Sequence, residues 1–258
     1  MIQNPCGFCI IPQGDGVYCY AFGAGKVSGD EMAAIEKSCV NCGRYHCDHL
    51  DSEWPDFCMT TNNPQEIFDE ALDEYRNDPM TRKIFQAAAE CEGLYYGALT
   101  RVEEVALFAH KIGAKKIGIA TCMGLRNETQ LFSKVLRAKG FESVCAVVCK
   151  VGGVDKTAVG IPDDVKVHPG CHESICNPIV QAKILNERKT DLNVIVGLCV
   201  GHDTLFIKHS EAPVTYLIVK DRVLAHNPAG ALYQQGMYYR RLMQPGFPPE
   251  RDRASKEA

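Results

Sequence analysis

Residues 115–150, KKIGIATCMGLRNETQLFSKVLRAKGFESVCAVVCK, decide the fold class of this chain. Short apolar runs rich in β-branched residues stand at both ends, at 115–121 and 142–149, and the stretch 127–140 between them has the apolar spacing of a helix. A strand, a helix and a second strand in this order form a βαβ unit, in which the two strands run parallel. The stretch therefore predicts a parallel sheet.

The same alternation continues toward the C-terminus. Apolar runs at 164–168, 193–199 and 214–220 read as further strands, and 177–189 reads as a helix. Runs as uniformly apolar as these are typical of strands that are buried on both faces. The sequence therefore predicts an α/β fold, a mostly parallel Rossmann-like sheet with helices on both faces.

We expect three regions along the chain. Residues 1–62 hold seven of the 14 cysteines among Gly, Asp and Pro, which predicts a small cysteine-rich metal-binding segment. Residues 63–243 are expected to form a helical hairpin and the α/β domain, with a capping box at Thr100 opening the helix before the first strand. The polar, proline-rich residues 244–258 are expected to be a flexible tail.

Composition narrows the function classes. The chain has 258 residues, 46% of them hydrophobic, and a net charge of −4, as expected of a globular protein. It has no long basic run, so nucleic acid is not the expected partner. It has no signal-like start and no apolar run of spanning length, so we expect a cytoplasmic protein without a membrane partner. A small-molecule substrate, a redox partner and the oligomeric state are not identified by the sequence.

The cysteine count is the unusual feature. Disulfide scaffolds are usually short secreted chains, whereas this chain is long and has apolar runs that can build a core unaided. Metal binding is therefore the favoured interpretation of the cysteine count. Cys145, in the middle of a predicted strand, and Cys91, in an alanine-rich helix, are instead expected to be packing residues.

Four cysteines stand at or after predicted strands, and they are Cys122, Cys149, Cys176 and Cys199. Because parallel strands end at the same edge of a sheet, these thiols are expected to converge there. Helix N-termini at this edge favour anionic sulfur. The set predicts a site for an iron–sulfur cluster or for zinc. Cys171 and His172 lie between two members of the set and could be alternate ligands or plain loop residues.

Polar residues beside these cysteines could contact a substrate. Lys150 follows Cys149 and precedes a pair of glycines, and His202 and Asp203 follow Cys199. His202 could donate a proton with Asp203 as its orienting carboxylate, although capping of a helix is the simpler role for Asp203. Residues 220–222 and 226–228 would lie at the same edge if the last strand is parallel, but a solvated β-turn explains 220–222 equally well.

The N-terminal cysteines allow two groupings. Cys39 and Cys42 form a CxxC knuckle that could be completed by Cys47 and Cys58, with His46 or His49 as substitutes. Alternatively, the knuckle could pair with that of Cys6 and Cys9 as in a zinc ribbon. Cys6, Cys9 and Cys19 could also form a further set.

Long stretches of the chain resemble a bacterial and archaeal family of predicted metal-binding proteins that has no assigned function. The resemblance covers roughly residues 39–233 and is carried by TRVEEVALFAHKIG (100–113), CKVGGVDK (149–156), CNPIVQAKILN (176–186) and GLCVGHDTLFIKHSEAPVTYLIVKDRVLAHNP (197–228). It implies metal binding, with cysteine patterns that fall on Cys39, Cys42, Cys47 and Cys58, and on Cys122, Cys149, Cys176 and Cys199. Cys6, Cys9, Cys19, Cys171 and His172 lie outside the shared pattern.

Three functions follow as hypotheses. The first is a metalloprotein with an iron–sulfur cluster at the sheet edge, used in redox or sulfur chemistry, and a second cysteine site near the N-terminus. The second is a non-catalytic zinc protein for metal handling, sensing or partner docking. The third is a thiol–disulfide oxidoreductase without a metal. No nucleophile–base pair or dinucleotide fingerprint identifies a reaction.

Overall fold

The structure is a computed structural model that describes residues 37–247. The predictions for Cys6, Cys9, Cys19 and residues 248–258 lie outside this range. The chain divides into two compact units, Met1–Cys58 and Met59–Ala258, and each is described by itself.

The second unit contains a parallel sheet of four strands. They are β1 (Lys116–Thr121), β2 (Ser143–Val148), β3 (Leu192–Val196) and β4 (Val214–Ile218), in the spatial order β2-β1-β3-β4. The middle strands β1 and β3 are buried almost throughout, and β2 and β4 form the two edges. The predicted parallel α/β fold is confirmed.

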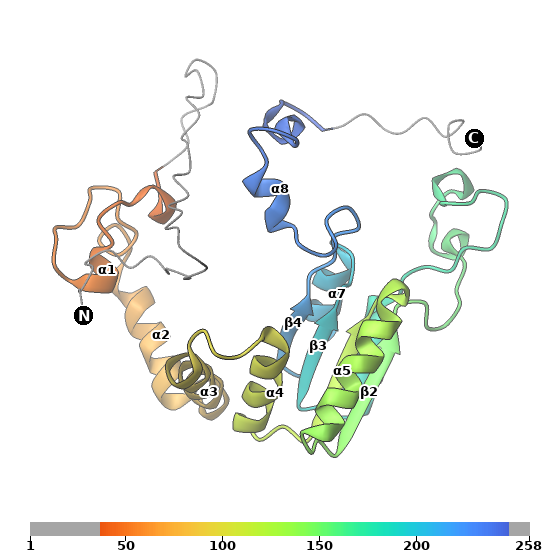
Figure 1. Cartoon of the computed structure of the whole chain (residues 1–258), viewed down its shortest axis with the longest axis horizontal. Helices are drawn as coiled ribbons and strands as arrows, with labels where there is room; N and C mark the ends of the chain where they lie inside the picture. The colour runs from red at the N-terminus through yellow and green to blue at the C-terminus, as the bar shows by residue number, and fades with distance from the viewer. Residues whose placement is uncertain (1–36, 248–258) are drawn as a thin grey trace, which may run out of the picture. The chain divides into compact units, whose positions relative to one another are not determined.

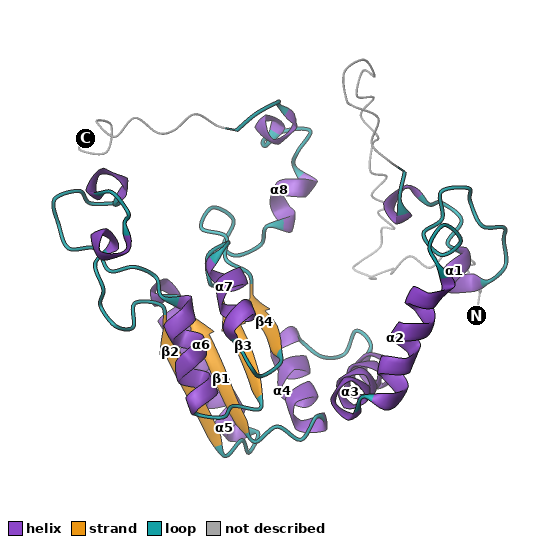
Figure 2. Ribbon diagram, turned by 180° about the vertical axis from the view of Figure 1, so that it is seen from behind, coloured by secondary structure: helices purple, strands orange, loops and turns teal. Residues whose placement is uncertain are grey.

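Helices cover both faces of the sheet. In Figure 1, α4 (Arg101–Lys111) and α5 (Arg126–Ala138) lie in front of the strands, and Figure 2 shows α6 (Pro178–Glu187) and α7 (His202–His209) on the opposite face. Both α5 and α6 pack on β1 and β2, while α4 packs on β4 and α7 on α6. The core lies between these layers and includes the fully buried Ile119, Leu136, Leu185, Val194 and Phe206.

A helical hairpin precedes α4. It consists of α2 (Gln65–Asn77) and α3 (Pro79–Tyr95), and the Asp78 carboxylate caps α3 by accepting from the Thr81 amide at 2.6 Å. The expected capping box at the start of α4 is present, because the Thr100 and Glu103 side chains bond each other's backbone amides. The remaining helices are short, namely α1 (His46–His49) in the first unit and α8 (Ala229–Tyr233) after β4. None of the described helices is long and apolar enough to cross a membrane.

One predicted strand is wrong. Residues 164–168 form no strand, because they lie in a 3₁₀ turn, Asp163–Val165, followed by bends. This segment belongs to a long connection between β2 and α6, residues 150–177, which we call the β2–α6 lobe.

Candidate thiolate site

The order of the strands creates the site. From β1 the chain crosses to β2 on one side, and β3 lies on the other side of β1. The carboxyl ends of β1 and β3 therefore border a topological switch point, where open α/β sheets bind their ligands. Cys122 directly follows β1, and Cys199 follows β3 by three residues.

The β2–α6 lobe brings a further cysteine to this edge. The chain leaves at Cys149, directly after β2, and returns where the Asn177 amide donates to the Cys149 carbonyl at 2.7 Å. The Asn177 side chain then caps α6 by accepting from the Val180 amide. Cys176 is thus held beside Cys149 at the start of a helix. The expectation that Cys176 follows a strand is wrong, because the segment before it is a loop.

Three sulfurs from three segments are in contact. The thiol of Cys149 lies within hydrogen-bonding contact of both Cys122 and Cys176. Two backbone amides at the start of the short 3₁₀ helix Met123–Leu125 also point at sulfur. The Met123 amide donates to Cys149 at 3.3 Å, and the Gly124 amide donates to Cys122. Amide donors of this kind stabilise thiolates.

Cationic side chains surround the sulfurs. Lys220, two residues after β4, donates to the Cys122 sulfur at 3.0 Å, and Lys150 contacts Cys176 and the Ser174 carbonyl. Arg222 donates to the Cys199 sulfur at 2.8 Å. Cys199 therefore reaches this edge with a partner of its own, whereas the other three cysteines are linked through Cys149.

Charge and hydrogen bonding shift the pKa values of the three cysteines in different directions. A hydrogen bond from Cys149, together with Lys220 and the Gly124 amide, lowers the pKa of Cys122 to about 4 despite its burial. A hydrogen bond from Cys149, with Lys150 and His202, lowers the pKa of Cys176 to about 5. Hydrogen bonding with Cys122 and Cys176, together with burial, favours the protonated form of Cys149 and raises its pKa. The arrangement favours two thiolates flanking a protonated thiol.

Two residues outside the cysteine set position the strand ends. Gln181, on α6, is fully buried, and its amide group donates to the carbonyls of Thr121 and Val147 at 3.1 and 2.6 Å. Gly197 has φ +66°, and a Cβ atom there would lie 1.9 Å from a methyl carbon of Leu125. The end of β3 therefore approaches the loop after β1 closely at residue 197, where any side chain would force Leu125 to move.

The predicted proton donor and its carboxylate have separate contacts. His202 opens α7 and lies close enough to Cys176 to lower its pKa. The Asp203 carboxylate accepts from the Tyr216 hydroxyl at 3.1 Å and from the Thr204 amide at 2.8 Å. Burial and this carboxylate raise the pKa of Tyr216 to about 12. The described contacts of Asp203 thus tie α7 to β4.

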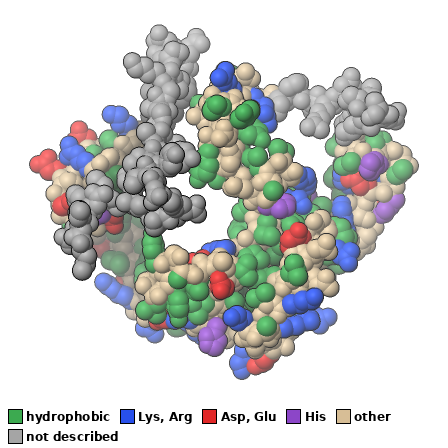
Figure 3. All heavy atoms as spheres, in the orientation of Figure 1, with side chains coloured by type: hydrophobic (Ala, Val, Ile, Leu, Met, Phe, Trp, Pro, Cys, Tyr) green, Lys and Arg blue, Asp and Glu red, His purple; other side chains and the backbone are tan. Residues whose placement is uncertain are grey.

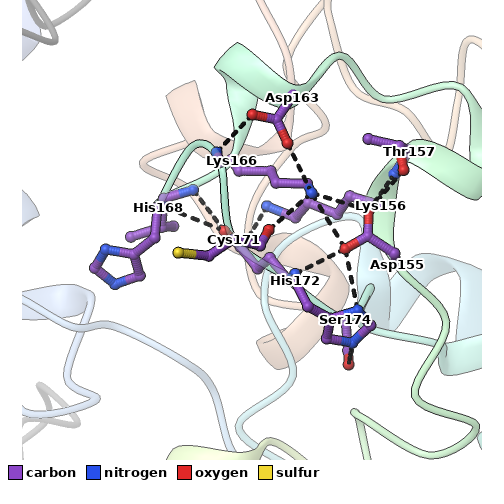
Figure 4. Close-up of polar contacts among 12 residues, drawn as sticks. Asp155, Lys156, Thr157, Asp163, Lys166, His168, Cys171, His172 and Ser174 are labelled. Atoms are coloured by element: carbon purple, nitrogen blue, oxygen red, sulfur yellow. Dashed lines mark hydrogen bonds and ion pairs between the residues drawn. The ribbon is translucent and has the colours of Figure 1, made fainter.

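Cys171 and His172 belong to the polar network of the β2–α6 lobe (Figure 4). The Cys171 carbonyl accepts from the buried Lys166 amine at 2.9 Å. The His172 ring contacts the Asp155 carboxylate at 3.3 Å and the Ser174 hydroxyl at 3.0 Å. Cys171 is exposed. The described contacts of both residues are inside the lobe.

In the first unit, the structure describes four of the predicted ligands. The Cys42 amide donates to the Cys39 carbonyl at 3.1 Å, which closes a turn across the CxxC knuckle. Cys47 is exposed and Cys58 half-buried. The two histidines are engaged elsewhere. His46 accepts from the Ser52 amide and packs edge-on against Trp54, and His49 contacts Asp48.

Within residues 37–247, no three His, Cys, Asp or Glu side chains surround one point with the geometry of a bound metal ion. At the sheet edge, hydrogen bonding joins the Cys149 sulfur to those of Cys122 and Cys176. Cys149 lies within reach of the other two sulfurs, and binding a metal would require all three side chains to turn toward a shared centre.

Sequence reasoning anticipates only some of the partners of the sulfurs. The sequence places Lys220 and Arg222 equally well at the sheet edge or in a solvated turn, and the parallel direction of β4 puts them at the edge. Helix starts at this edge are expected to offer backbone amides to the sulfurs, and the amides of Met123 and Gly124 do so. The role of Gln181 has no counterpart in the sequence analysis.

Comparison with known proteins adds the family. A family model described as "Protein of unknown function (DUF1847)" matches residues 58–217. The uncharacterized protein MJ0455 of Methanocaldococcus jannaschii is 47% identical over 180 residues, which cover 70% of this chain and 90% of that protein. No solved structure matches the chain. The matched range contains Cys58 and the four cysteines of the sheet edge, and it begins after Cys39, Cys42 and Cys47.

Proposed function

We propose that this chain, which belongs to the DUF1847 family of proteins of unknown function, binds an iron–sulfur cluster through Cys122, Cys149 and Cys176 and uses it in redox or sulfur chemistry. The observation that carries the proposal is the contact of the Cys149 sulfur with the other two sulfurs. The three cysteines come from three separate segments, so their convergence is a product of the fold.

The surroundings of the sulfurs fit such a group. Iron–sulfur clusters are held by thiolates, and hydrogen bonds to the sulfurs tune their potential. Here the amides of Met123 and Gly124 and the amine of Lys220 already donate to sulfur. Cationic neighbours would also offset the negative charge that several thiolates bring to a partly buried site.

The position of the cysteines supports a reacting centre over a purely structural one. Structural zinc sites are closed by four ligands. At this sheet edge the Cys149 sulfur contacts those of Cys122 and Cys176, while Cys199 is bonded to Arg222. Cys199 would complete the ligand set if it left Arg222, and otherwise one metal position would stay open to a small molecule. A bound cluster would supply electron transfer, or a Lewis acid at the open position, and Lys150 and His202 would contact the molecule bound there.

We further propose that Cys39, Cys42, Cys47 and Cys58 form a second, zinc-binding site in the first unit. The turn across Cys39 and Cys42 supports this assignment, because a knuckle of this kind presents two thiols to one metal. The residues Cys6, Cys9 and Cys19 are part of the same hypothesis but lie outside the described range.

The test is the content of iron, zinc and acid-labile sulfide per chain after strictly anaerobic purification. We expect iron with matching sulfide in the wild type, loss of both in Cys176→Ala, and retention of both in Cys42→Ala, which should lose zinc. Cys145→Ala is the matched control, because Cys145 lies in the middle of β2 and packs against the core. A wild-type protein that holds neither iron nor sulfide would refute the cluster.

The same sulfur contacts also support a second candidate, a metal-free thiol–disulfide enzyme. The Cys122 or Cys176 thiolate, with its lowered pKa, would attack a substrate disulfide and release one of its sulfurs as a thiol. Cys149 would then displace the second substrate thiol from the mixed disulfide, leaving a Cys122–Cys149 or a Cys149–Cys176 disulfide and a reduced substrate. In that case the purified protein would hold no metal at the sheet edge. Non-reducing peptide mapping would then show one of these two disulfides; a reduced dithiol would open it, and the oxidised, disulfide form of the same reagent would re-form it.

A further inference from the structure

A second site lies between α5 and the edge strand β2. It is a groove of about 390 Å³, a volume in the range of small-molecule sites. Its lining comes from one stripe of α5, from the end of β1 and from two side chains of β2, Ala146 and Val148. Figure 3 shows Lys and Arg side chains gathered over this part of the molecule.

The charged side chains of the groove are all cations. Arg126, Lys134 and Arg137 line it, and no carboxylate does. Among the ion pairs of residues 37–247, none involves these three cations. The chain as a whole carries a net charge of −4, so this local excess of positive charge is not a consequence of composition. Unpaired like charges along one helix face are unfavourable, and a bound anion would relieve them.

The remaining polar groups of the groove are neutral. Asn127 and Gln130 contribute amides, which can donate to an anion. The floor is formed by the buried hydroxyls of Thr121 and Thr129, which lie 2.7 Å apart and already bond to backbone carbonyls. The threonine hydroxyls thus already have hydrogen-bond partners within the protein, whereas the amides of Asn127 and Gln130 can donate to a ligand.

The spacing of the cations along α5 indicates how the negative charges of the ligand are distributed. With a rise of 1.5 Å per residue, the Cα atoms of Arg126 and Lys134 lie roughly 12 Å apart along α5, and those of Arg126 and Arg137 roughly 16 Å apart. One compact anion could not use all three charges equally, whereas an anion with several charges in a row could. Guanidinium groups match phosphate oxygens in pairs.

We propose that this groove binds a small phosphorylated molecule with two or more phosphate groups. Arg126, Lys134 and Arg137 would contact the phosphates, Asn127 and Gln130 would donate to their oxygens, and Ala146 and Val148 would form the apolar wall. The site is independent of any metal at the cysteines and stands even if the proposed cluster is absent.

The test uses the full chain and calorimetric titration at physiological salt, with inorganic tripolyphosphate, ADP and inorganic phosphate as probes. We expect saturable binding at one site per chain by tripolyphosphate, by ADP or by both, and weaker binding of inorganic phosphate. Tighter binding of ADP would assign the ligand to nucleotides, and tighter binding of tripolyphosphate would assign it to polyphosphates. Arg137→Ala and Lys134→Ala should each weaken binding about tenfold or more.

Lys183→Ala is the matched control, because it removes one positive charge from an exposed position on α6 outside the groove. It should leave binding unchanged, and the groove variants should unfold at no lower urea concentration than the wild type. The proposal is overturned by absence of binding to all three probes or by equal weakening in Lys183→Ala.

Discussion

Gly197 joins the end of β3 to the thiolate site, and its side-chain position is already filled by Leu125. Gly197→Ala should lower the free energy of unfolding by about 3 kcal/mol, from roughly 1 kcal/mol for an alanine at positive φ and roughly 2 kcal/mol for overpacking. Gly140→Ala is the control, since Gly140 has φ +89° and nothing within 4 Å of its Cβ position. It should cost only the backbone part, about 1 kcal/mol. Urea denaturation measures both, and equal losses would mean that Leu125 yields to the added methyl group.

At the same scale, the sequence identified the cysteines better than their partners. Cys122 and Cys149 were predictable because each directly follows an apolar run that could only be a buried strand. Cys176 was predicted for a wrong reason, because a loop rather than a strand delivers it. Lys220 lies 98 residues from the sulfur that it contacts. No local pattern encodes a contact over that distance, so the cationic surroundings could be recognised only once β4 had its place in the sheet.

Ion pairs and hydrogen bonds between side chains stabilise the β2–α6 lobe. The amine of Lys166 is buried between the carboxylates of Asp155 and Asp163, at 2.9 and 2.8 Å, and Asp155 also accepts from Thr157 and from the Glu173 amide (Figure 4). Asp155→Asn should therefore open the lobe, with hydrogen exchange of residues 150–177 faster by on the order of tenfold. Asp163→Asn should have a smaller effect, because the Asp163 carboxylate is half exposed.

The effect of Asp155→Asn on hydrogen exchange in the lobe should depend on pH. Hydrogen bonds from Thr157, then from Lys166 and the Glu173 amide, lower the pKa of Asp155 below its ordinary 3.8. A carboxyl group with a lowered pKa stabilises the fold above its ordinary pKa, and this contribution is lost as the pH falls further. The exchange difference between wild type and Asp155→Asn should therefore be full at pH 6 and shrink below about pH 4. A difference that persists unchanged at pH 2.5 would contradict the role given to the carboxylate.

The lobe is also where the prediction of elements failed. Residues 164–168 are predicted as a strand because Val165 and Val167 give the segment the look of a short apolar run, although these valines alternate with polar residues. In the structure Val165 and Val167 are more than half exposed and Lys166 is buried, so the alternation is inverted. The reason is that Lys166 finds two carboxylates inside the lobe, whereas a strand would need a neighbour with which to pair. A periodicity cannot show which of its two faces points inward.

For the whole molecule, the sequence predicted the fold class and left the arrangement open. Uniformly apolar runs separated by helices specify a covered parallel sheet, and β1 and β3 are buried as that requires. The strand order β2-β1-β3-β4 could not be predicted in this way, because several strand orders are compatible with the same succession of strands and helices. That order puts Cys122 and Cys199 on either side of the switch point. A site built from four loops therefore depends on topology as much as on its cysteines.

When a metal centre binds to a site assembled in this way, segments that lie far apart in the sequence should become protected together. We expect anaerobic reconstitution with iron and sulfide to slow hydrogen exchange together at 122–125, 149–151, 174–178 and 197–202, because one centre would tie these segments to one another. Binding to the folded state alone should raise the free energy of unfolding by about 3 kcal/mol at a hundredfold excess over the dissociation constant. Cys176→Ala should abolish the change at all four segments. Protection confined to residues 37–58 would instead assign the metal to the first unit and leave the three sulfurs of the sheet edge to thiol chemistry.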